Sequence, residues 1–127
     1  MTELKKRILI IDDQPSMTHF MRRCLEQSGF EVYEENDSKK AIVAARAFRP
    51  DLILLDVMMP DVSGPEVAEQ CKADKILRDT PIIFLTAVVE KEEVEKNQGL
   101  IGGRRFIAKP VDIHLMLACI REDLRVH

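Results

Sequence analysis

The sequence predicts an α/β protein: a doubly wound parallel sheet of five strands, covered on both faces by five helices. Short apolar runs recur along the chain, and segments with apolar residues at helical spacing stand between them. Most of these runs are too short for helices and lack the alternation of a half-exposed sheet, which is typical of strands buried on both faces. Strands that alternate with helices are joined by right-handed crossovers, which makes the sheet parallel.

Length and composition limit the classes of function. The chain has 127 residues, 46% of them hydrophobic and 32% charged, which predicts a single domain over residues 1–127 with its core at about 7–124. The net charge of −3 offers no basic surface, so we expect no direct binding to nucleic acid. A polar N-terminus and the lack of a long apolar run predict a cytoplasmic protein with no secretory signal and no membrane partner. The three scattered cysteines are expected to be reduced and buried.

The first half of the chain alternates strand, helix, strand and helix. Residues 8–11 are an apolar run, and Pro15 opens a helix at its first position, where the missing N–H costs nothing. Gly29 ends that helix, and residues 30–34 alternate as an edge strand does. An alanine-rich helix follows and ends before Pro50. The apolar face predicted for the first helix comprises Met17, Phe20, Met21, Cys24 and Leu25.

The second half continues the alternation. Residues 52–55 form a fully apolar strand, and Ser63 with Glu66 forms a capping box at the start of a third helix. The remaining elements are a strand over 82–85, a charged helix over 90–98, a strand over 106–108 and a final helix striped by Ile113, Met116, Leu117, Ile120 and Leu124.

Polar residues follow four of the five predicted strands, and the alternating edge strand is the exception. The first strand is followed by Asp12 and Asp13, and the next apolar strands are followed by Asp56, Thr86 and Lys109. Ligands bind outside the carboxyl ends of the strands in doubly wound sheets. Each residue alone fits a helix terminus or a loop, but four strand ends that deliver polar groups to one rim predict a site.

The charges at this rim indicate its chemistry. Three carboxylates roughly 5 Å apart repel by about 3 kcal/mol per pair at an effective dielectric near 20, so such a cluster raises its own pKa values or binds a cation. Oxygen ligands without His or Cys favour Mg²⁺, Mn²⁺ or Ca²⁺ over zinc. Lys109 adds a positive charge and Thr86 a hydroxyl donor, which together complete a site for a phosphoryl group.

These residues give the chain a close resemblance to the receiver domain of bacterial two-component response regulators. The resemblance covers about residues 7–124 and implies a flavodoxin-like sheet with strand order 2-1-3-4-5. It rests on four matching segments in order: Asp12-Asp13, Asp56-Val57-Met58-Met59-Pro60 with Gly64, Thr86-Ala87, and Phe106-Ile107-Ala108-Lys109-Pro110.

The resemblance implies a phosphoacceptor and a metal site. Asp56 resembles the aspartate that attacks phosphorus to form an acyl phosphate. Asp13 resembles the direct Mg²⁺ ligand, while Asp12 acts largely through a bound water. Asp56 itself and the backbone carbonyl of Met58 complete the protein ligands, and Mn²⁺ is the alternative ion.

The resemblance also implies roles for residues around the acceptor. Lys109 pairs with Asp56 and then with the phosphoryl oxygens, and its peptide bond to the following proline is cis. Thr86 and Phe106 form the switch pair, although Phe106 lacks the hydroxyl of a tyrosine. Met58 and Val88 flank the phosphoryl group and tune its lifetime.

The function implied is a phosphorylation-activated switch that is not an enzyme beyond its own phosphorylation and autodephosphorylation. A histidine kinase or a phosphotransfer protein is the expected donor. The expected output face comprises the helix over 90–98, the last strand and the final helix, and it contacts a downstream protein or, on phosphorylation, a second copy of the chain. Leu115 and Cys119, one turn apart, are expected to add an apolar contact there or to be partly buried in the monomer.

Three alternatives belong to other classes. A receiver-like docking module takes no phosphoryl group. A haloacid-dehalogenase-type phosphatase needs a second aspartate two residues after the nucleophile, where this chain has Met58. A flavin or nucleotide module needs a Gly- or Ser/Thr-rich loop after the first strand, where Asp12-Asp13-Gln14-Pro15-Ser16 repels a phosphate without metal.

Overall fold

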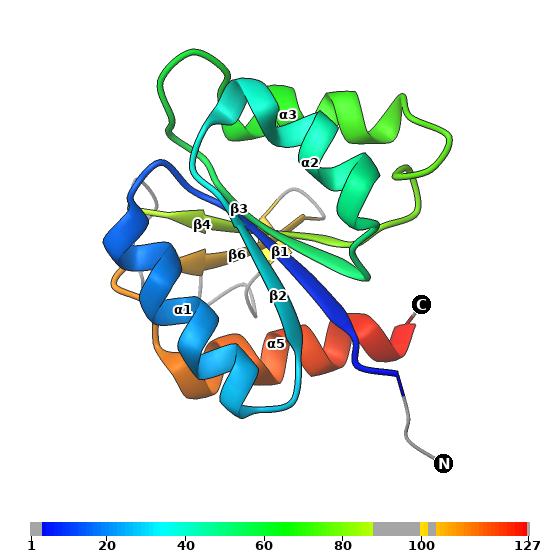
Figure 1. The fold of residues 1–127 in the computed structure, drawn as a ribbon. Helices are drawn as coiled ribbons and strands as arrows, with labels where there is room; N and C mark the ends of the chain where they lie inside the picture. The colour runs from blue at the N-terminus through cyan, green and yellow to red at the C-terminus, as the bar shows by residue number, and fades with distance from the viewer. Residues whose placement is uncertain (1–3, 88–99, 102–103, 127) are drawn as a thin grey trace.

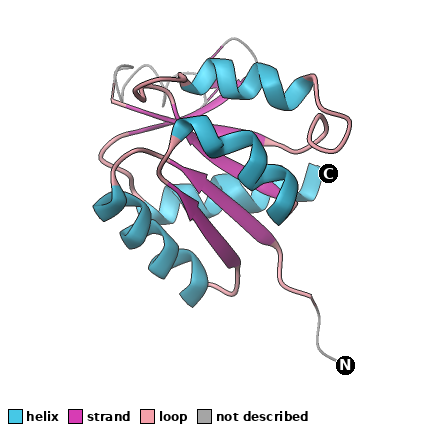
Figure 2. Cartoon of the chain, turned by 45° about the horizontal axis from the view of Figure 1, so that its top comes forward, coloured by secondary structure: helices cyan, strands magenta, loops and turns pink. Residues whose placement is uncertain are grey.

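The computed structural model describes residues 4–87, 100–101 and 104–126 as one sheet between two layers of helices (Figure 1). Helices α1 and α5 cover one face and α2 and α3 the other, and Figure 2 shows the same layers from a second direction. The elements in chain order are β1 (Arg7–Ile11), α1 (Pro15–Gln27), β2 (Glu31–Glu35), a 3₁₀ turn (Ser38–Lys40), α2 (Ala41–Phe48), β3 (Leu52–Asp56), α3 (Gly64–Lys72), β4 (Ile82–Thr86), β5 (Leu100–Ile101), β6 (Arg104–Ala108) and α5 (Ile113–Val126).

The sheet confirms the predicted topology and adds one strand. Its order is β2-β1-β3-β4-β6-β5, and the first five strands pair in parallel, which is the expected order 2-1-3-4-5 with β6 as the fifth. The two-residue β5 pairs antiparallel with β6 and extends that edge, a correction to the purely parallel expectation. Four α-helices lie in the described ranges, while the helix expected over 90–98 falls outside them.

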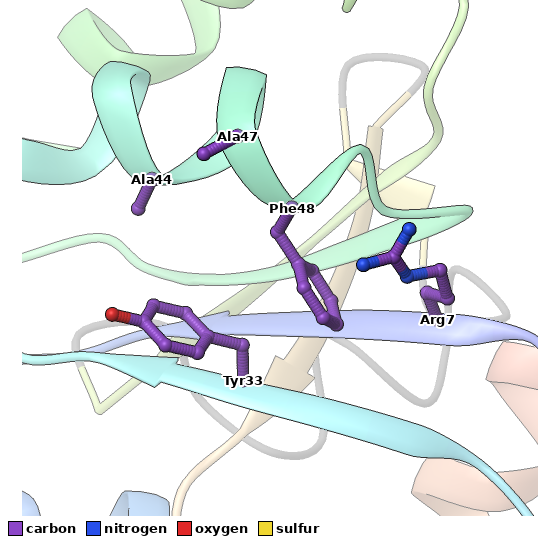
Figure 3. A pocket seen from close by; sticks show the side chains of 5 residues that line it. All are labelled: Arg7, Tyr33, Ala44, Ala47 and Phe48. Carbon is purple, nitrogen blue, oxygen red and sulfur yellow. The ribbon is translucent and has the colours of Figure 1, made fainter.

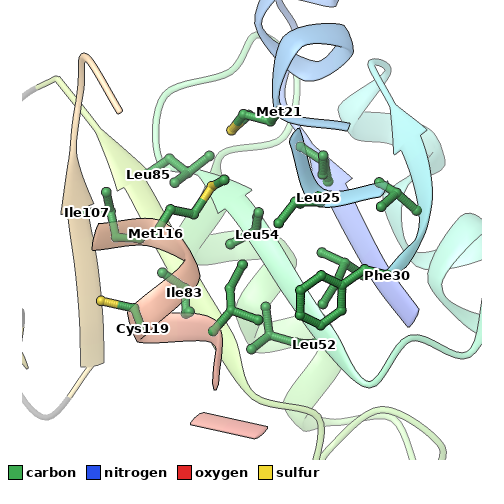
Figure 4. Close-up of a cluster of buried hydrophobic side chains, with 14 residues drawn as sticks. Met21, Leu25, Phe30, Leu52, Leu54, Ile83, Leu85, Ile107, Met116 and Cys119 are labelled. Atoms are coloured by element: carbon green, nitrogen blue, oxygen red, sulfur yellow. The ribbon is translucent and has the colours of Figure 1, made fainter. Parts of the chain in front are cut away.

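Two apolar layers hold the helices on the sheet, because alternate residues of a strand point to opposite faces. Ile8 and Ile10 of β1 face α1 and α5, whereas Leu9 and Ile11 face α2 and α3, and all four are fully buried. Figure 4 shows the first of these layers, where side chains of α1 and α5 meet those of the central strands.

The core face of α1 differs from the prediction at one position. Met21 and Leu25 are buried as expected, but Phe20 is 52% exposed and Thr18 is buried in its stead. The predicted and the observed faces share Met21 and Leu25, and the observed face carries Thr18 rather than Phe20. A hydroxyl tolerates this burial because it is hydrogen bonded to Glu34 of β2 at 2.7 Å.

Helix α5 packs as its stripe predicts, and it decides between the two alternatives left open for Cys119. Met116 and Ile120 are fully buried against the sheet. Cys119 is only 8% exposed and belongs to the same core, so it supplies no surface contact, and Leu115 alone of that pair is exposed. All three cysteines are free thiols, and only Cys24 is not fully buried. None of the helices in the described ranges combines the length and apolarity needed to cross a membrane.

Candidate functional site

The parallel register brings the predicted polar residues to one end of the sheet. Asp56 and Thr86 are the last residues of β3 and β4, while Asp12 and Lys109 directly follow β1 and β6. Asp56 pairs with Leu85, one residue before Thr86, so the strand ends are level with one another. The convergence expected from the sequence is therefore observed.

Three carboxylates form the centre of this rim. Ligand-capable oxygens of Asp12, Asp13 and Asp56 all lie within 4.8 Å of one another, which agrees with the separation expected from the sequence. Asp12 and Asp56 are buried, whereas Asp13 is half-buried. Burial raises the pKa of Asp56, and repulsion from Asp12 raises it further, while the hydrogen bond from Lys109 opposes the shift without cancelling it.

Lys109 connects two of the carboxylates. Its Nζ lies 2.9 Å from Asp12 Oδ2 and 3.1 Å from Asp56 Oδ1, and only the second of these partners was expected from the family resemblance. Burial opposes the charged amine, but hydrogen bonds with Asp12 and Asp56 outweigh it and raise the pKa of Lys109. One ammonium group against three carboxylates leaves the site short of positive charge, which is the condition under which a divalent cation binds.

The donor set fits a hard cation. All three side chains of the cluster offer carboxylate oxygens and none offers sulfur or imidazole, which suits Mg²⁺ or Mn²⁺. The side chain of Met58 is 66% exposed, so it is not part of the core. Met58 is two residues after Asp56 in the chain.

The other predicted residues are placed as follows. Thr86 is buried, and its carbonyl accepts a hydrogen bond from the Lys109 N–H at 2.8 Å. Phe106 is half-buried and stacks on Phe84 with ring centroids 5.1 Å apart. The peptide bond between Lys109 and the next residue is cis, as expected. Val88 lies outside the described residues.

Gly64 is required by the close approach of α3 to the end of β3, a reason that the sequence motif did not reveal. A Cβ atom built on Gly64 would lie 2.3 Å from the carbonyl oxygen of Asp56 and 2.8 Å from the Cα of Val57. The Gly64 N–H also donates to the Val57 carbonyl at 2.9 Å. The first turn of α3 therefore rests directly on the backbone that carries Asp56.

We predict that Gly64→Ala displaces this backbone. Because the atoms in the way are backbone atoms, relief requires α3 or the end of β3 to shift, and we expect a loss of about 1–3 kcal/mol of unfolding free energy, as for other overpacked sites. Urea denaturation measures this. Ala73→Gly, at the exposed C-terminal end of α3, is the matched control for a change between the same two residues. Equal losses from the two changes would contradict the close-approach explanation.

Strand β2 contributes to the rim, which corrects the expectation that the edge strand does not. Asn36, directly after β2, donates its side-chain amide to the backbone carbonyl of Asp12 at 2.8 Å and to Thr18 Oγ1 at 3.0 Å. The Asp12 N–H donates to the Glu35 carbonyl at 3.2 Å. In the sequence, the role of Asn36 is indicated only by its position as a polar residue after this strand. The alternating pattern of residues 30–34 did not point to it.

A separate hollow of about 280 Å³ lies between β1, β2 and α2 (Figure 3). Phe48 is at its centre, with the Arg7 guanidinium 4.3 Å from its ring centroid and the Tyr33 ring 5.7 Å away. Arg7 begins β1, whereas Asp12 follows the end of that strand. The hollow beside Arg7 is therefore separate from the carboxylate cluster.

Comparisons with known proteins agree with the fold. A family profile described as the response regulator receiver domain matches residues 8–121. The DNA-binding dual master transcriptional regulator RpaA of Synechocystis sp. is 38% identical over 120 residues, which are 94% of this chain and 49% of that protein. The polar-differentiation response regulator DivK of Brucella anthropi is 34% identical over 122 residues, which are 95% of this chain and 98% of that protein.

The solved structures include the chemotaxis protein CheY4 of Vibrio cholerae, with a TM-score of 0.80 and 25% identity over 94% of this chain and 98% of that one. A response regulator from Desulfuromonas acetoxidans has a TM-score of 0.79 and 27% identity over 95% of this chain and 98% of that one. The chain thus spans about half the length of the first curated relatives it matches and nearly the whole length of others.

Proposed function

Because the chain belongs to the response regulator receiver domain family, we propose that it is a phosphorylation-activated signalling switch with Asp56 as its phosphoacceptor. One observation carries the proposal: Asp56 ends the central strand β3 as a buried carboxylate between two further carboxylates and Lys109. A histidine kinase or a phosphotransfer protein, each of which carries a phosphohistidine, is the proposed donor.

In the proposed transfer, a carboxylate oxygen of Asp56 attacks the phosphorus of the phosphohistidine. A P–O bond forms, the P–N bond breaks, and its electron pair returns to the imidazole of the donor. Lys109, already 3.1 Å from Asp56 Oδ1, offers its charge to the incoming phosphoryl oxygens. Thr86, at the end of the neighbouring strand, supplies a hydroxyl donor to the same group.

The proposed ligands for Mg²⁺, or for Mn²⁺ as the alternative, are Asp13 and Asp56 directly, Asp12 through water, and the backbone carbonyl of Met58. The clustered oxygens support this assignment. A bound divalent ion supplies Lewis-acid neutralisation of the phosphoryl charge.

The proposed output passes from Thr86 to Phe106 and then to the face formed by β6, α5 and residues 90–98, the last of which lie outside the described ranges. A downstream protein or a second phosphorylated copy is the proposed partner, with the exposed Leu115 on this face. Phe106 stacks on Phe84 in the present structure, so a rotamer change of Phe106 would break that contact.

Labelling separates this function from its alternatives. The protein is incubated with Mg²⁺ and acetyl phosphate, and its intact mass and the free phosphate are measured. A switch gains one phosphoryl group and then loses it slowly. A docking module gains nothing, and a phosphatase releases phosphate with many turnovers, so either outcome would overturn the proposal.

We predict that Mg²⁺ stabilises the wild type and not Asp13→Asn. An ion that binds only the folded state adds about 2.7 kcal/mol at one hundred times its dissociation constant, and Asp13 is the ligand proposed to contact it directly. Thermal melts with and without Mg²⁺ measure the gain, and Asp79→Asn, an exposed aspartate outside the cluster, is the control. Equal shifts for the wild type and Asp13→Asn would reject this ligand assignment.

We also predict a long-lived phosphoprotein. Hydrolysis needs a water held in line behind the phosphorus, and the apolar Met58 and Val88 cannot orient one. The double variant Met58→Asn with Val88→Glu should hydrolyse about tenfold faster, equivalent to roughly 1.4 kcal/mol of barrier. The loss of radiolabelled phosphate in Mg²⁺ buffer measures the hydrolysis rates of the wild type and the double variant. Because the Met58 side chain is exposed, Met58→Asn should not disturb the packing. Equal rates would show that these side chains do not set the lifetime.

A further inference from the structure

A line of hydrogen bonds runs from the acidic cluster through the interior to the surface of α1. Its inner end is the Asp12 carbonyl, which accepts from Asn36 Nδ2 at 2.8 Å. The same Asn36 nitrogen donates to Thr18 Oγ1 at 3.0 Å, and the Thr18 hydroxyl donates to Glu34 Oε1 at 2.7 Å. Thr18 is fully buried, so water cannot substitute for either partner.

The two ends of this line determine the direction of every bond in it. The Asp12 carbonyl only accepts, so Asn36 must turn the NH₂ group of its amide toward it. The Glu34 carboxylate also only accepts, so the single proton of Thr18 goes to it and the Thr18 lone pair faces Asn36. The carbonyl of Pro15 lies 3.1 Å from Thr18 Oγ1, but the carboxylate is nearer and charged.

The outer end of the line is held by charge. The Glu34 side chain is only 10% exposed, although it carries a carboxylate. Its Oε2 lies 3.4 Å from Arg22 Nη1 and 3.2 Å from His19 Nδ1, both on α1. Glu34 thus remains an acceptor for Thr18 while it ties the end of β2 to α1.

The inner end restrains a residue of the cluster at its backbone. Asp12 donates its N–H to the Glu35 carbonyl and accepts from Asn36, so both bonds to its main chain come from the end of β2. Its carboxylate is held separately, by the Gln14 N–H at 3.1 Å and by Lys109 at 2.9 Å. A shift of the Asp12 backbone would therefore move its carboxylate, and that of the next residue, relative to Asp56.

We infer that Asn36, Thr18 and Glu34 are positioning residues that hold the Asp12–Asp13 backbone so that its carboxylates face Asp56 and a divalent cation. The inference rests on the proposed function, because the cation belongs to that site. The three residues are not proposed to contact the cation or the phosphoryl group. They act only through the backbone of Asp12.

Two substitutions of Thr18 test the inference with opposite expected results. Thr18→Val keeps the branched shape but breaks the line, so the Mg²⁺ dissociation constant should rise about tenfold, as for other residues that orient metal ligands. Thr18→Ser keeps the hydroxyl and loses a buried methyl, so it should melt at a lower temperature and bind Mg²⁺ as the wild type does. Isothermal titration calorimetry with Mg²⁺, well below the melting temperature, measures affinity separately from stability.

Glu34→Gln extends the test to the outer end of the line, and it keeps the test decisive if Thr18→Val does not fold. It should weaken Mg²⁺ binding, whereas Glu31→Gln, on the same strand and outside the line, should not. The inference would be overturned if Glu34→Gln and any folded Thr18→Val bound Mg²⁺ with wild-type affinity. It would also be overturned if Thr18→Ser and Thr18→Val lost the same affinity. A wild type that binds no Mg²⁺ would overturn the metal-dependent function itself and the inference with it.

Discussion

Replacement of Asp56 by asparagine is expected to abolish phosphoryl incorporation and to leave the fold intact. An amide is not a nucleophile toward phosphorus, and Asn has nearly the same shape as Asp. Intact mass after brief labelling with acetyl phosphate and Mg²⁺ measures the effect. Asp79→Asn, which changes an exposed aspartate outside the cluster, should label like the wild type. A phosphoryl mass on Asp56→Asn would mean that another residue is the acceptor.

The same variant should be more stable than the wild type at neutral pH without Mg²⁺. The pKa of Asp56 is raised, mainly by burial and then by repulsion from Asp12, so its ionisation costs stability. That cost is absent below the unfolded-state pKa, grows as the pH rises, and is complete above the raised folded-state pKa. The advantage of Asp56→Asn should therefore shrink as the pH falls toward about 4, the ordinary aspartate pKa. Urea denaturation of both proteins along a pH series measures this advantage. An advantage that stays constant as the pH falls would contradict the assignment of the cost to the ionisation of Asp56.

Lys109→Met is expected to cost about 3 kcal/mol of unfolding free energy at neutral pH without Mg²⁺, because removing one partner of a buried ion pair leaves the other charge uncompensated. Lys109 is 14% exposed and contacts both Asp12 and Asp56, so its loss leaves three carboxylates with no cation between them. The pKa of Lys109 is raised, so its contribution is complete at neutral pH and, on the alkaline side, is lost as the pH rises through the raised pKa.

Urea denaturation of Lys109→Met measures this loss, and Lys72→Met, at an exposed position of α3, is the matched control. Adding Asp12→Asn should recover part of the loss, because it removes one of the two carboxylates that lose their partner. The deficit should also shrink in acid, as Asp56 takes up its proton at a raised pKa. Equal losses in Lys109→Met and Lys72→Met would mean that the lysine does not hold the cluster together.

The order of elements and the position of the rim follow from local pattern. Runs such as residues 8–11 and 52–55 have no polar side chain to place in water, so they become central strands. In a parallel sheet, the residues after such strands share one edge, which brings Asp12, Asp56 and Lys109 together without knowledge of any contact. The apolar stripe of α5 is correct for the same reason, since helical spacing specifies a face.

Most of the errors and omissions concern groups whose environment depends on distant segments. Spacing could not choose between Phe20 and Thr18 on α1, because the choice depends on Glu34, a partner on another strand. Likewise, the sequence left open whether Cys119 lies at the surface or in the monomer, and only the packing of α5 shows that it belongs to the core. The two-residue β5 is too short to carry a pattern of its own.

Long-range contacts alone specify the details of the site. The bond between Lys109 and Asp12 joins residues 97 positions apart, and the one between Asn36 and Asp12 starts from a strand that seemed to contribute nothing. The need for glycine at position 64 comes from the backbone of Asp56, which lies against it only after β3 and α3 have packed. Hydrophobic periodicity records which face of an element is buried, whereas hydrogen-bond partners and close approaches depend on how whole elements meet, and for this reason they become visible only in the folded chain.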